Sequence, residues 1–370
     1  MTTSTLSTAN RTALVLGATG SFGAHAVQAL IKHGWTIRAL ARDPVAAIGK
    51  LGARTPIDWI QGDAMDRASV VAAARGAQLI VHAVNPPRYR NWKGTVLPMT
   101  ENAIAAAKAS GARLAIPGNV YNFAPGSGAM IGEDAPQVPA TRKGAIRVEM
   151  ERRLRQASDE HGVKVLILRA GDFFGPAAPN SALAWLTQKS RGRLTGVYSP
   201  GPAAHDFAYM PDLGECLARL VGAEDRLGAF EVFHFRGHWM EDGQAFGHAM
   251  RQVTGNATMP IRAFPWIALH VLAPFDETMR EMLEMGYLWK QPIGLDNAKL
   301  VAFLGEEPHT PLETALRATL ADMGLLEDRG LLEDRGLLED RGLLEDGGLL
   351  EDAPRPAQPS RANSTMAPAM

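Results

Sequence analysis

The sequence predicts an α/β fold, in which a doubly wound parallel sheet is followed by a smaller C-terminal lobe. Two observations support this prediction. Over residues 12–168, short apolar runs alternate with segments whose apolar residues recur at helical spacing. The runs are also nearly continuous in apolar residues, which is typical of parallel strands that helices cover on both faces.

The first predicted elements are a strand, a glycine turn and a helix. The apolar run 12–17 continues directly into Gly17-Ala-Thr-Gly20-Ser-Phe-Gly23, and helical spacing then extends to residue 34. Glycines at three-residue spacing let the chain turn, let the backbone approach a diphosphate and let the helix pack on the strand. The pattern favours a Rossmann-type dinucleotide site over a strand, turn and helix without a ligand. We expect cofactor contacts from Gly17, Thr19, Gly20, Ser21, Phe22 and Gly23.

The second predicted strand, residues 35–40, ends at an arginine. In a dinucleotide fold this end meets the adenosine ribose, where a carboxylate binds a free 2′-hydroxyl and arginine pairs with a 2′-phosphate. Arg42 stands there, with Arg38 behind it. NADP(H) is therefore the preferred cofactor. Asp43 keeps NAD(H) open, and a solvated turn is the alternative role for Arg42.

The third and fourth strands, residues 57–60 and 79–84, end in further candidate contacts. Asp63 can accept a hydrogen bond from an adenine amino group, and Asp66 is better placed to cap the helix that follows, residues 67–75. His82 is more simply a packed strand residue. The other candidate cofactor contacts beside these strand ends are Ala64, Ala83 and Asn85.

The alternation continues and then becomes irregular. It predicts helices at 101–110 and 145–160 and strands at 113–116 and 163–168. After residue 180, an apolar segment at 264–274 and a methionine-bearing helix at 276–285 predict a substrate-covering lobe, whose methionines are more simply core. The predicted organisation is a flexible N-terminus (1–10), a dinucleotide-binding domain (11–178), a mixed lobe with elements that return to the sheet (179–323) and a tail (324–370).

The tail contains a short repeat. Leu-Leu-Glu-Asp occurs five times at a period of six between residues 325 and 352. Six residues turn an α-helix by about 600°, so the leucine pairs form no continuous stripe, and a glycine in most repeats weakens a helix. We expect an expanded repeat and a disordered segment after it, with a leucine-bearing docking tail as the alternative.

Composition narrows the class of partner. The formal net charge is −1 and the pI is about 6.8, which predicts no nucleic-acid or membrane partner and favours a small-molecule substrate. The single cysteine, Cys216, predicts a core residue in a reducing compartment, and no cysteine–histidine spacing indicates a metal. Without an apolar leader or a membrane-spanning run, we expect a cytoplasmic protein.

With these motifs in order, the chain resembles the extended short-chain dehydrogenase/reductase superfamily. The resemblance covers about residues 11–320 and points to the NAD-dependent epimerase/dehydratase group, with features of its atypical NmrA-like relatives. It implies a nicotinamide cofactor and a possible homodimer paired through helices 101–110 and 145–160. The turn Arg42-Asp43-Pro44 looks like that of NADP-binding atypical members. The motifs that carry the resemblance are the glycine triplet, Gly62-Asp63, Val120-Tyr121, residues 171–176, residues 209–213 and residues 304–308.

The catalytic motif departs from this resemblance. Members typically carry Ser or Thr after the fifth strand and Tyr-x-x-x-Lys at the start of the next long helix. Here Pro117 falls at the first position, Lys143 replaces the tyrosine and Arg147 replaces the lysine. A neighbouring cation lowers the pKa of a lysine, so Lys143 beside Arg147 is the first candidate acid/base. A phosphate-contacting or surface lysine is the alternative, and Lys143 is also a candidate cofactor contact.

Two further proton donors are candidates. Tyr121 lies on the loop that the resemblance places beside the nicotinamide, where its hydroxyl can donate to a carbonyl. His205 is the other, with Asp206 or Asp212 available to orient its ring. A loop histidine bonded to backbone is the alternative for His205.

These features predict an NADP(H)-dependent oxidoreductase that acts on a small carbonyl or hydroxyl substrate. One alternative is a nucleotide-sugar epimerase or dehydratase that retains its cofactor, although that group relies on the missing tyrosine. The other is a non-catalytic NADP(H)-binding sensor of the NmrA type, which the altered motif favours. A set of polar residues expected to face the pocket, Tyr121, Lys143, Arg88 and His205, argues against the sensor.

Overall fold

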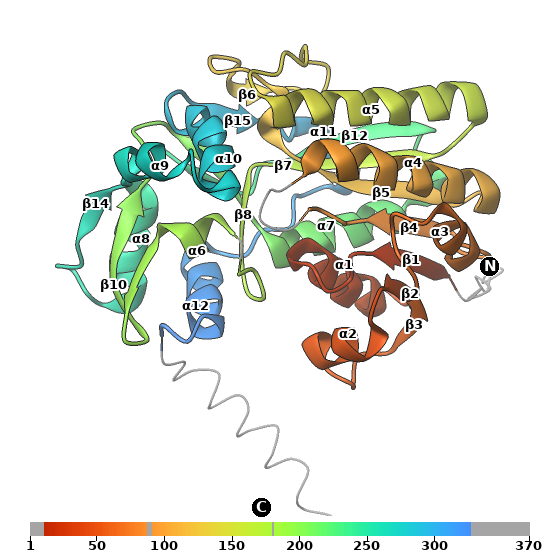
Figure 1. The fold of residues 1–370 in the computed structure, drawn as a ribbon, viewed down its shortest axis with the longest axis horizontal. Helices are drawn as coiled ribbons and strands as arrows, with labels where there is room; N and C mark the ends of the chain where they lie inside the picture. The colour runs from red at the N-terminus through yellow and green to blue at the C-terminus, as the bar shows by residue number, and fades with distance from the viewer. Residues whose placement is uncertain (1–10, 87–90, 180, 327–370) are drawn as a thin grey trace, which may run out of the picture. The chain divides into compact units, whose positions relative to one another are not determined.

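The structure is a computed structural model that describes residues 11–86, 91–179 and 181–326 (Figure 1). The expectations for the N-terminus (1–10), for Arg88 and for nearly all of the repeat and tail lie outside these residues. Among the helices of the described residues, none combines the length and the apolarity that a bilayer crossing requires.

A seven-stranded sheet lies at the centre, with all of its neighbouring strands parallel. Its order is β12-β7-β5-β4-β1-β2-β3, so the chain reverses direction across the sheet between β1 and β4. Ligands of such sheets bind at the carboxyl ends of the strands beside this reversal. The strands are β1 Thr12–Leu16, β2 Thr36–Ala41, β3 Ile57–Gln61, β4 Leu79–His82, β5 Arg113–Gly118, β7 Val165–Ala170 and β12 Phe230–Phe235.

Helices cover both faces of this sheet, as the predicted doubly wound fold requires (Figure 1). On one face lie α3 (Arg67–Ala73), α4 (Trp92–Ser110) and α5 (Arg142–His161), and on the other lie α1 (Ser21–Lys32), α7 (Met210–Gly222) and α11 (Ala298–Leu304). The short helix α2 (Pro44–Leu51) connects β2 to β3.

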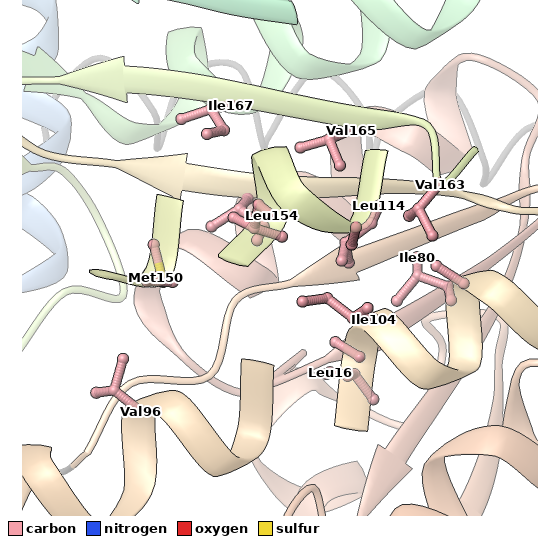
Figure 2. Close-up of a cluster of buried hydrophobic side chains, with 14 of the residues drawn as sticks. Leu16, Ile80, Val96, Ile104, Leu114, Met150, Leu154, Val163, Val165 and Ile167 are labelled. Carbon is pink, nitrogen blue, oxygen red and sulfur yellow. The ribbon is translucent and has the colours of Figure 1, made fainter. Parts of the chain in front are cut away.

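Successive side chains of each strand point to opposite faces of the sheet and therefore belong to two separate cores. Leu14 and Leu16 of β1 pack toward α4 and α5, whereas Ala13 and Val15 pack toward α1 and α7. Figure 2 shows the first core, where side chains of β1, β4, β5 and β7 meet those of α4 and α5. Cys216 of α7 is fully buried in the second core, as expected. Both faces of the sheet are therefore closed, and its strand ends are left for ligands.

The smaller lobe follows β7 and has its own core. A three-stranded sheet, β14-β10-β9, packs with α6, α8 and α12, and a second sheet, β13-β11-β15-β6, with β8 against β11, joins the lobe to the central sheet. The strands are β6 Gly128–Ile131, β8 Asp172–Phe174, β9 Thr187–Ser190, β10 Arg193–Ser199, β11 His205–Tyr209, β13 His238–Met240, β14 Ile261–Ala263 and β15 Ile293–Leu295. The helices are α6 Ala182–Leu186, α8 Ala245–Thr254, α9 Trp266–Leu272, α10 Glu277–Met285 and α12 Leu312–Asp322, with 3₁₀ turns η2 Val120–Asn122, η3 Glu224–Arg226 and η4 Gly286–Trp289.

Three features of the elements differ from the sequence prediction. Helix α4 begins at Trp92, nine residues before the predicted start, because Pro98 is accommodated inside the helix. Helix α5 begins at Arg142, where the Thr141 side chain accepts a hydrogen bond from the Gly144 N–H. Strand β12 supplies a seventh strand that the sequence did not predict. It arrives from the part of the chain assigned to the lobe, as do α7 and α11.

Candidate functional site

The glycine turn after β1 leaves no room for a side chain at Gly17 or at Gly23. Gly17 has a φ of +87°, and a Cβ placed on it would lie 2.8 Å from the Ala83 carbonyl oxygen at the end of β4. A Cβ on Gly23 would lie 2.1 Å from the Gly17 carbonyl oxygen, so the helix packs directly on the turn. Gly20 donates its N–H to the Gly17 carbonyl at 2.9 Å. These contacts are the ones that the three-glycine pattern predicts for a dinucleotide cradle.

The amino end of α1 opens into this cradle. Gly20 is its N-cap, and no side chain caps the first turn. The N–H groups of a first helical turn have no partners within the helix and therefore suit a diphosphate. Thr19 and Gly20 are exposed and Ser21 is half-buried, whereas the Phe22 side chain is buried in the core and can offer a ligand only its backbone.

The three charged residues in and just after β2 have different surroundings. The Arg42 side chain is exposed just beyond the strand. Asp43 caps α2, with its carboxylate accepting the Ala46 N–H at 3.0 Å. Arg38 donates to the Ala73 and Arg75 carbonyls, each at 2.9 Å. Of these three side chains, Arg42 is the one whose guanidinium faces solvent without a structural role in the fold.

The end of β3 holds the residue predicted to contact adenine, Asp63, and the residue predicted to cap the next helix, Asp66. The Asp63 carboxylate is half-buried and accepts the Met65 N–H at 2.9 Å. Asp66 caps α3 by accepting from Ala68 and Ser69, so the predicted capping role of Asp66 is confirmed, whereas the adenine contact of Asp63 stays a prediction. The neighbouring Ala64 carbonyl accepts from the Asn102 side chain at 2.9 Å, which ties this loop to α4.

Three of the candidate catalytic residues lie around one tryptophan. Trp92 begins α4, and its ring lies 6.4 Å from the ring of Tyr121. The Lys143 Nζ and the Arg147 guanidinium lie 5.8 Å and 5.0 Å from the Trp92 ring centroid. Arg147 also donates to the Asn85 side chain at 3.4 Å. The fold therefore brings Tyr121, Lys143 and Arg147 together beside Asn85, a predicted cofactor contact.

A buried hydrogen-bond network fixes the loop of Tyr121 against the helix of Lys143. The Glu151 carboxylate on α5 accepts from the Arg169 guanidinium at 2.8 Å and from the Asn122 amide at 2.9 Å. Arg169 also donates to the Asn119 carbonyl at 2.8 Å. Because Arg169 and Glu151 are almost completely buried, this network holds the η2 turn and α5 in one arrangement.

Lys143 is buried and paired with the lobe. Only 1% of its surface is exposed, and its ammonium contacts the Glu281 carboxylate and lies 3.8 Å from that of Glu284, both on α10. Arg142 pairs with the same two carboxylates at 3.2 Å each. Burial is the main cause that lowers the pKa of Lys143 to about 8, and the Arg142 cation acts in the same direction against the opposing effect of the Glu284 carboxylate. The direction agrees with the prediction, but the neighbouring cation that acts is Arg142 and not Arg147.

His205 occupies a different place from that expected. It is buried in β11, and its ring lies 4.7 Å from that of Trp289. The prediction that Asp206 or Asp212 orients it is wrong, because Asp206 bonds the Leu295 N–H and Asp212 bonds Thr310. Neighbours along a strand point to opposite faces, so Asp206 turns away from its neighbour His205. The partner is Asp172 of β8, whose carboxylate lies 3.1 Å from the His205 Nε2.

A cavity lies between Tyr121 and the lobe. The empty space measured there is about 680 Å³, a figure that includes space open to solvent. Its polar groups are Tyr121, Asp172 and Glu281, and most of the rest of its wall is apolar. The apolar lining residues are Ala182, Trp185, Leu186, Pro200, Phe264, Trp266, Met282, Met285, Leu288 and Trp289.

Sequence reasoning anticipated only part of this cavity. It named Tyr121 and assigned the segments 264–274 and 276–285 to the lobe that covers the substrate. It did not name Glu281, Asp172 or the three lining tryptophans as site residues, since they are far from the glycine motif in sequence. Met285 is 8% exposed in the core, as expected of these methionines, yet it also lines the cavity.

This architecture defines a class of protein: a dinucleotide-binding α/β fold whose strand ends face a cavity covered by a smaller lobe. The model of the NAD dependent epimerase/dehydratase family matches residues 13–234. The chain belongs to this family. Its members are NAD-dependent enzymes of the oxidoreductase and epimerase type, and the cradle formed by Gly17, Gly20 and Gly23 fits their nicotinamide dinucleotide.

Two curated plant proteins are distant relatives. A 3beta-hydroxysteroid-dehydrogenase/decarboxylase of Arabidopsis thaliana is 21% identical over 84% of this chain and 61% of its own length. An isoflavone reductase homologue of Zea mays is 25% identical over 54% of this chain and 56% of its own length. The chain therefore spans about three fifths of the length of these curated relatives.

Solved structures share the fold. A UDP-glucuronic acid 4-epimerase from Bacillus cereus, in complex with UDP-glucuronic acid and NAD, has a TM-score of 0.67 and 17% identity over 84% of this chain and 98% of its own. A dTDP-glucose 4,6-dehydratase from Streptomyces venezuelae, with NAD bound, has a TM-score of 0.67 and 18% identity over 88% and 98%. At such identities the likeness shows the fold alone.

Proposed function

We propose that the protein is an NADP(H)-dependent reductase of a small carbonyl or hydroxyl substrate. The preference for NADP(H) is supported at the end of β2. There the Asp43 carboxylate is engaged as the cap of α2, while the exposed Arg42 guanidinium is available to a 2′-phosphate. An arginine–phosphate contact of this kind contributes about 1.5–3 kcal/mol, which is roughly ten- to hundredfold in affinity.

The composition of the cavity carries the choice of a reductase. A nucleotide sugar brings a diphosphate, which proteins hold with basic side chains or helix N-termini. Among the described residues, those that line the cavity include neither lysine nor arginine, and two of them, Asp172 and Glu281, are acidic. Such a wall favours a substrate without phosphate groups. The names of the two curated relatives, a dehydrogenase and a reductase homologue, agree with this choice.

Lys143 is the proposed proton donor. When bound, the nicotinamide supplies the hydride that a carbonyl reduction needs. The pKa of Lys143 is lowered to about 8, so its ammonium is protonated at neutral pH but releases the proton more readily than an ordinary lysine does. This property suits a general acid. Glu281 holds that ammonium and also lines the cavity, so it connects the donor to the substrate space. Tyr121, which lines the cavity directly, is the second candidate.

Two alternatives stay open to test. The family and its solved neighbours favour an epimerase or dehydratase that retains its cofactor. The replacement of the tyrosine by Lys143 favours a non-catalytic NADP(H)-binding sensor of the NmrA type.

One assay separates these three functions. Purified protein is mixed with NADPH, and absorbance at the reduced nicotinamide band is followed while aldehydes, ketones and enones are added. We expect oxidation of NADPH that depends on one class of carbonyl compound. A cofactor that copurifies and never exchanges would indicate the epimerase, and tight binding of NADPH with no oxidation across the panel would indicate the sensor.

A further inference from the structure

We infer that the cavity binds an uncharged substrate built on a flat, apolar ring system with one hydroxyl or carbonyl group. This inference rests on the proposed reductase function in one respect: that function makes the ligand of the cavity a substrate. The nature of the ligand is inferred from three observations: the fixed aromatic side chains of the cavity, its adaptable aliphatic side chains and the charges of its polar residues.

The aromatic wall is held in place before any ligand binds. The Trp266 indole N–H donates to the Pro200 carbonyl at 2.7 Å, and its ring lies 4.8 Å from that of Phe264. The Trp289 ring lies 4.7 Å from His205 and 5.9 Å from Phe207. Rings fixed in this way offer flat surfaces on which another ring can stack without further loss of side-chain freedom.

The remaining apolar wall is aliphatic and can adapt. Met282 and Met285 of α10 lie along the cavity with Leu186 and Leu288. Methionine is unbranched and polarisable, and its sulfur packs favourably against aromatic rings. Rigid aromatic surfaces together with adaptable aliphatic ones suit a flat ligand of varied outline.

The polar residues of the cavity disfavour negative charge on the ligand. The Glu281 carboxylate is balanced by Lys143 and Arg142, and the Asp172 carboxylate lies 3.1 Å from the His205 ring nitrogen. An anionic ligand would meet two carboxylates at low exposure without a basic partner among the described lining residues. The Tyr121 hydroxyl can donate to a ketone oxygen, and the carboxylates can accept from an alcohol. One neutral hydroxyl or carbonyl group therefore matches these polar residues.

The test is direct binding to the full chain without cofactor, measured by equilibrium dialysis with three probes. 2-Acetonaphthone carries a ring system and a ketone, 2-naphthoate carries the same rings and a carboxylate, and 2-butanone carries the ketone without rings. We expect 2-acetonaphthone to bind at least about tenfold more tightly than either of the others, because stacking and the absence of charge both favour it. Equal or tighter binding of 2-naphthoate or of 2-butanone would overturn the inference.

Variants locate the bound probe. Trp266→Ala removes a ring of the aromatic wall and is expected to weaken 2-acetonaphthone binding about tenfold. Trp35→Phe is the matched control, because Trp35 is buried beside Arg11 and does not line the cavity. If Trp266→Ala does not fold, Trp185→Ala replaces it, since Trp185 is 38% exposed and lines the same cavity. Unchanged binding in the folded variant contradicts the inference.

Failure of this inference can be distinguished from failure of the reductase proposal. If 2-acetonaphthone binds as expected and NADPH is oxidised by no carbonyl compound, the ligand class stands and the reductase function does not. If NADPH is oxidised as readily by 2-butanone as by 2-acetonaphthone, the reductase stands and the ring-bearing substrate class does not.

Discussion

Lys143 is a single residue whose surroundings determine whether the site can move a proton. It lies in the position that the family resemblance gives to tyrosine, and the fold surrounds it with Glu277, Glu281 and Glu284 of α10, with Arg142 and Arg147 of its own helix and with Trp92. Burial lowers its pKa to about 8 in spite of the nearby carboxylates. A lysine in this state is a usable general acid at neutral pH.

If Lys143 donates the proton, the rate of carbonyl reduction depends on its protonation. The donor must carry its proton, so kcat/KM is expected to fall as pH rises through about 8. Lys143→Met should reduce kcat at least about tenfold and remove this decline. The measurement is the pH profile of NADPH oxidation.

Tyr121→Phe supplies the comparison. If Tyr121→Phe still shows the decline of kcat/KM near pH 8, Lys143 remains the proton donor. A large loss of kcat in Tyr121→Phe, with Lys143→Met close to wild type and correctly folded, assigns the donor role to the tyrosine instead.

At the scale of elements, the contact between α1 and the turn after β1 admits glycine alone. Gly23→Ala would place a methyl carbon 2.1 Å from the Gly17 carbonyl, so the helix must move away from the turn. We expect a loss of about 1–3 kcal/mol in the free energy of unfolding. NADPH affinity should fall with it, because the same helix end holds the diphosphate.

A second glycine-to-alanine change controls for helix propensity. Gly49→Ala lies in α2, where an added Cβ has no neighbouring atom within 4 Å. It should leave NADPH affinity unchanged and stabilise the fold by up to about 1 kcal/mol. Urea titrations of both variants measure this difference. Equal stability and equal affinity in the two variants would show that close packing at Gly23 is not required.

Most elements of the central sheet could be predicted from the sequence. Six strands and the order of helices follow from local patterns, because a strand covered on both faces must be apolar along its length. Strand β12 was missed: Glu231 and His234 interrupt its apolar residues, and it lies at the edge of the sheet. The first half of α4 was missed because Gly94 and Pro98 are poor signals of a helix.

The site was predictable only where it is local in sequence. The glycine cradle and Arg42 come from one strand–turn–helix–strand unit, so spacing alone locates them. The cavity is assembled from η2, β8, α6, α9, α10 and η4, and the contact of Lys143 with Glu281 joins residues 138 positions apart. No local pattern specifies such a pairing, since it depends on how the lobe folds back on the sheet.

At the scale of the whole molecule, buried histidines couple stability to pH. Burial lowers the pKa of His82 to about 4 and that of His238 to about 4, and it lowers the pKa of His234 to about 3. A histidine whose pKa is lower in the folded state favours the folded state above its unfolded pKa of about 6.5. That stability is lost as pH falls from about 6.5 toward about 4, because the unfolded chain binds the proton first.

His82 offers a test of this coupling, since it is 4% exposed within β4. Between pH 7.5 and pH 5 it should account for a loss of roughly 2 kcal/mol in unfolding free energy. His82→Asn should be less stable at pH 7.5 and should lose less stability on acidification. His248 is exposed, and His248→Gln should have the same free energy of unfolding as wild type at both pH values. Urea titrations measure each variant, and an unchanged pH dependence in His82→Asn would refute the assignment.

The proposed function depends on a phosphorylated dinucleotide that the amino end of α1 and Arg42 hold together. The most direct test compares NADPH and NADH affinities, by titration of nicotinamide fluorescence, in wild type and in Arg42→Ala. We expect wild type to bind NADPH at least about tenfold more tightly than NADH, and Arg42→Ala to bring the ratio of the two affinities close to one. An unchanged ratio in Arg42→Ala, or no binding of either dinucleotide by wild type, would contradict it.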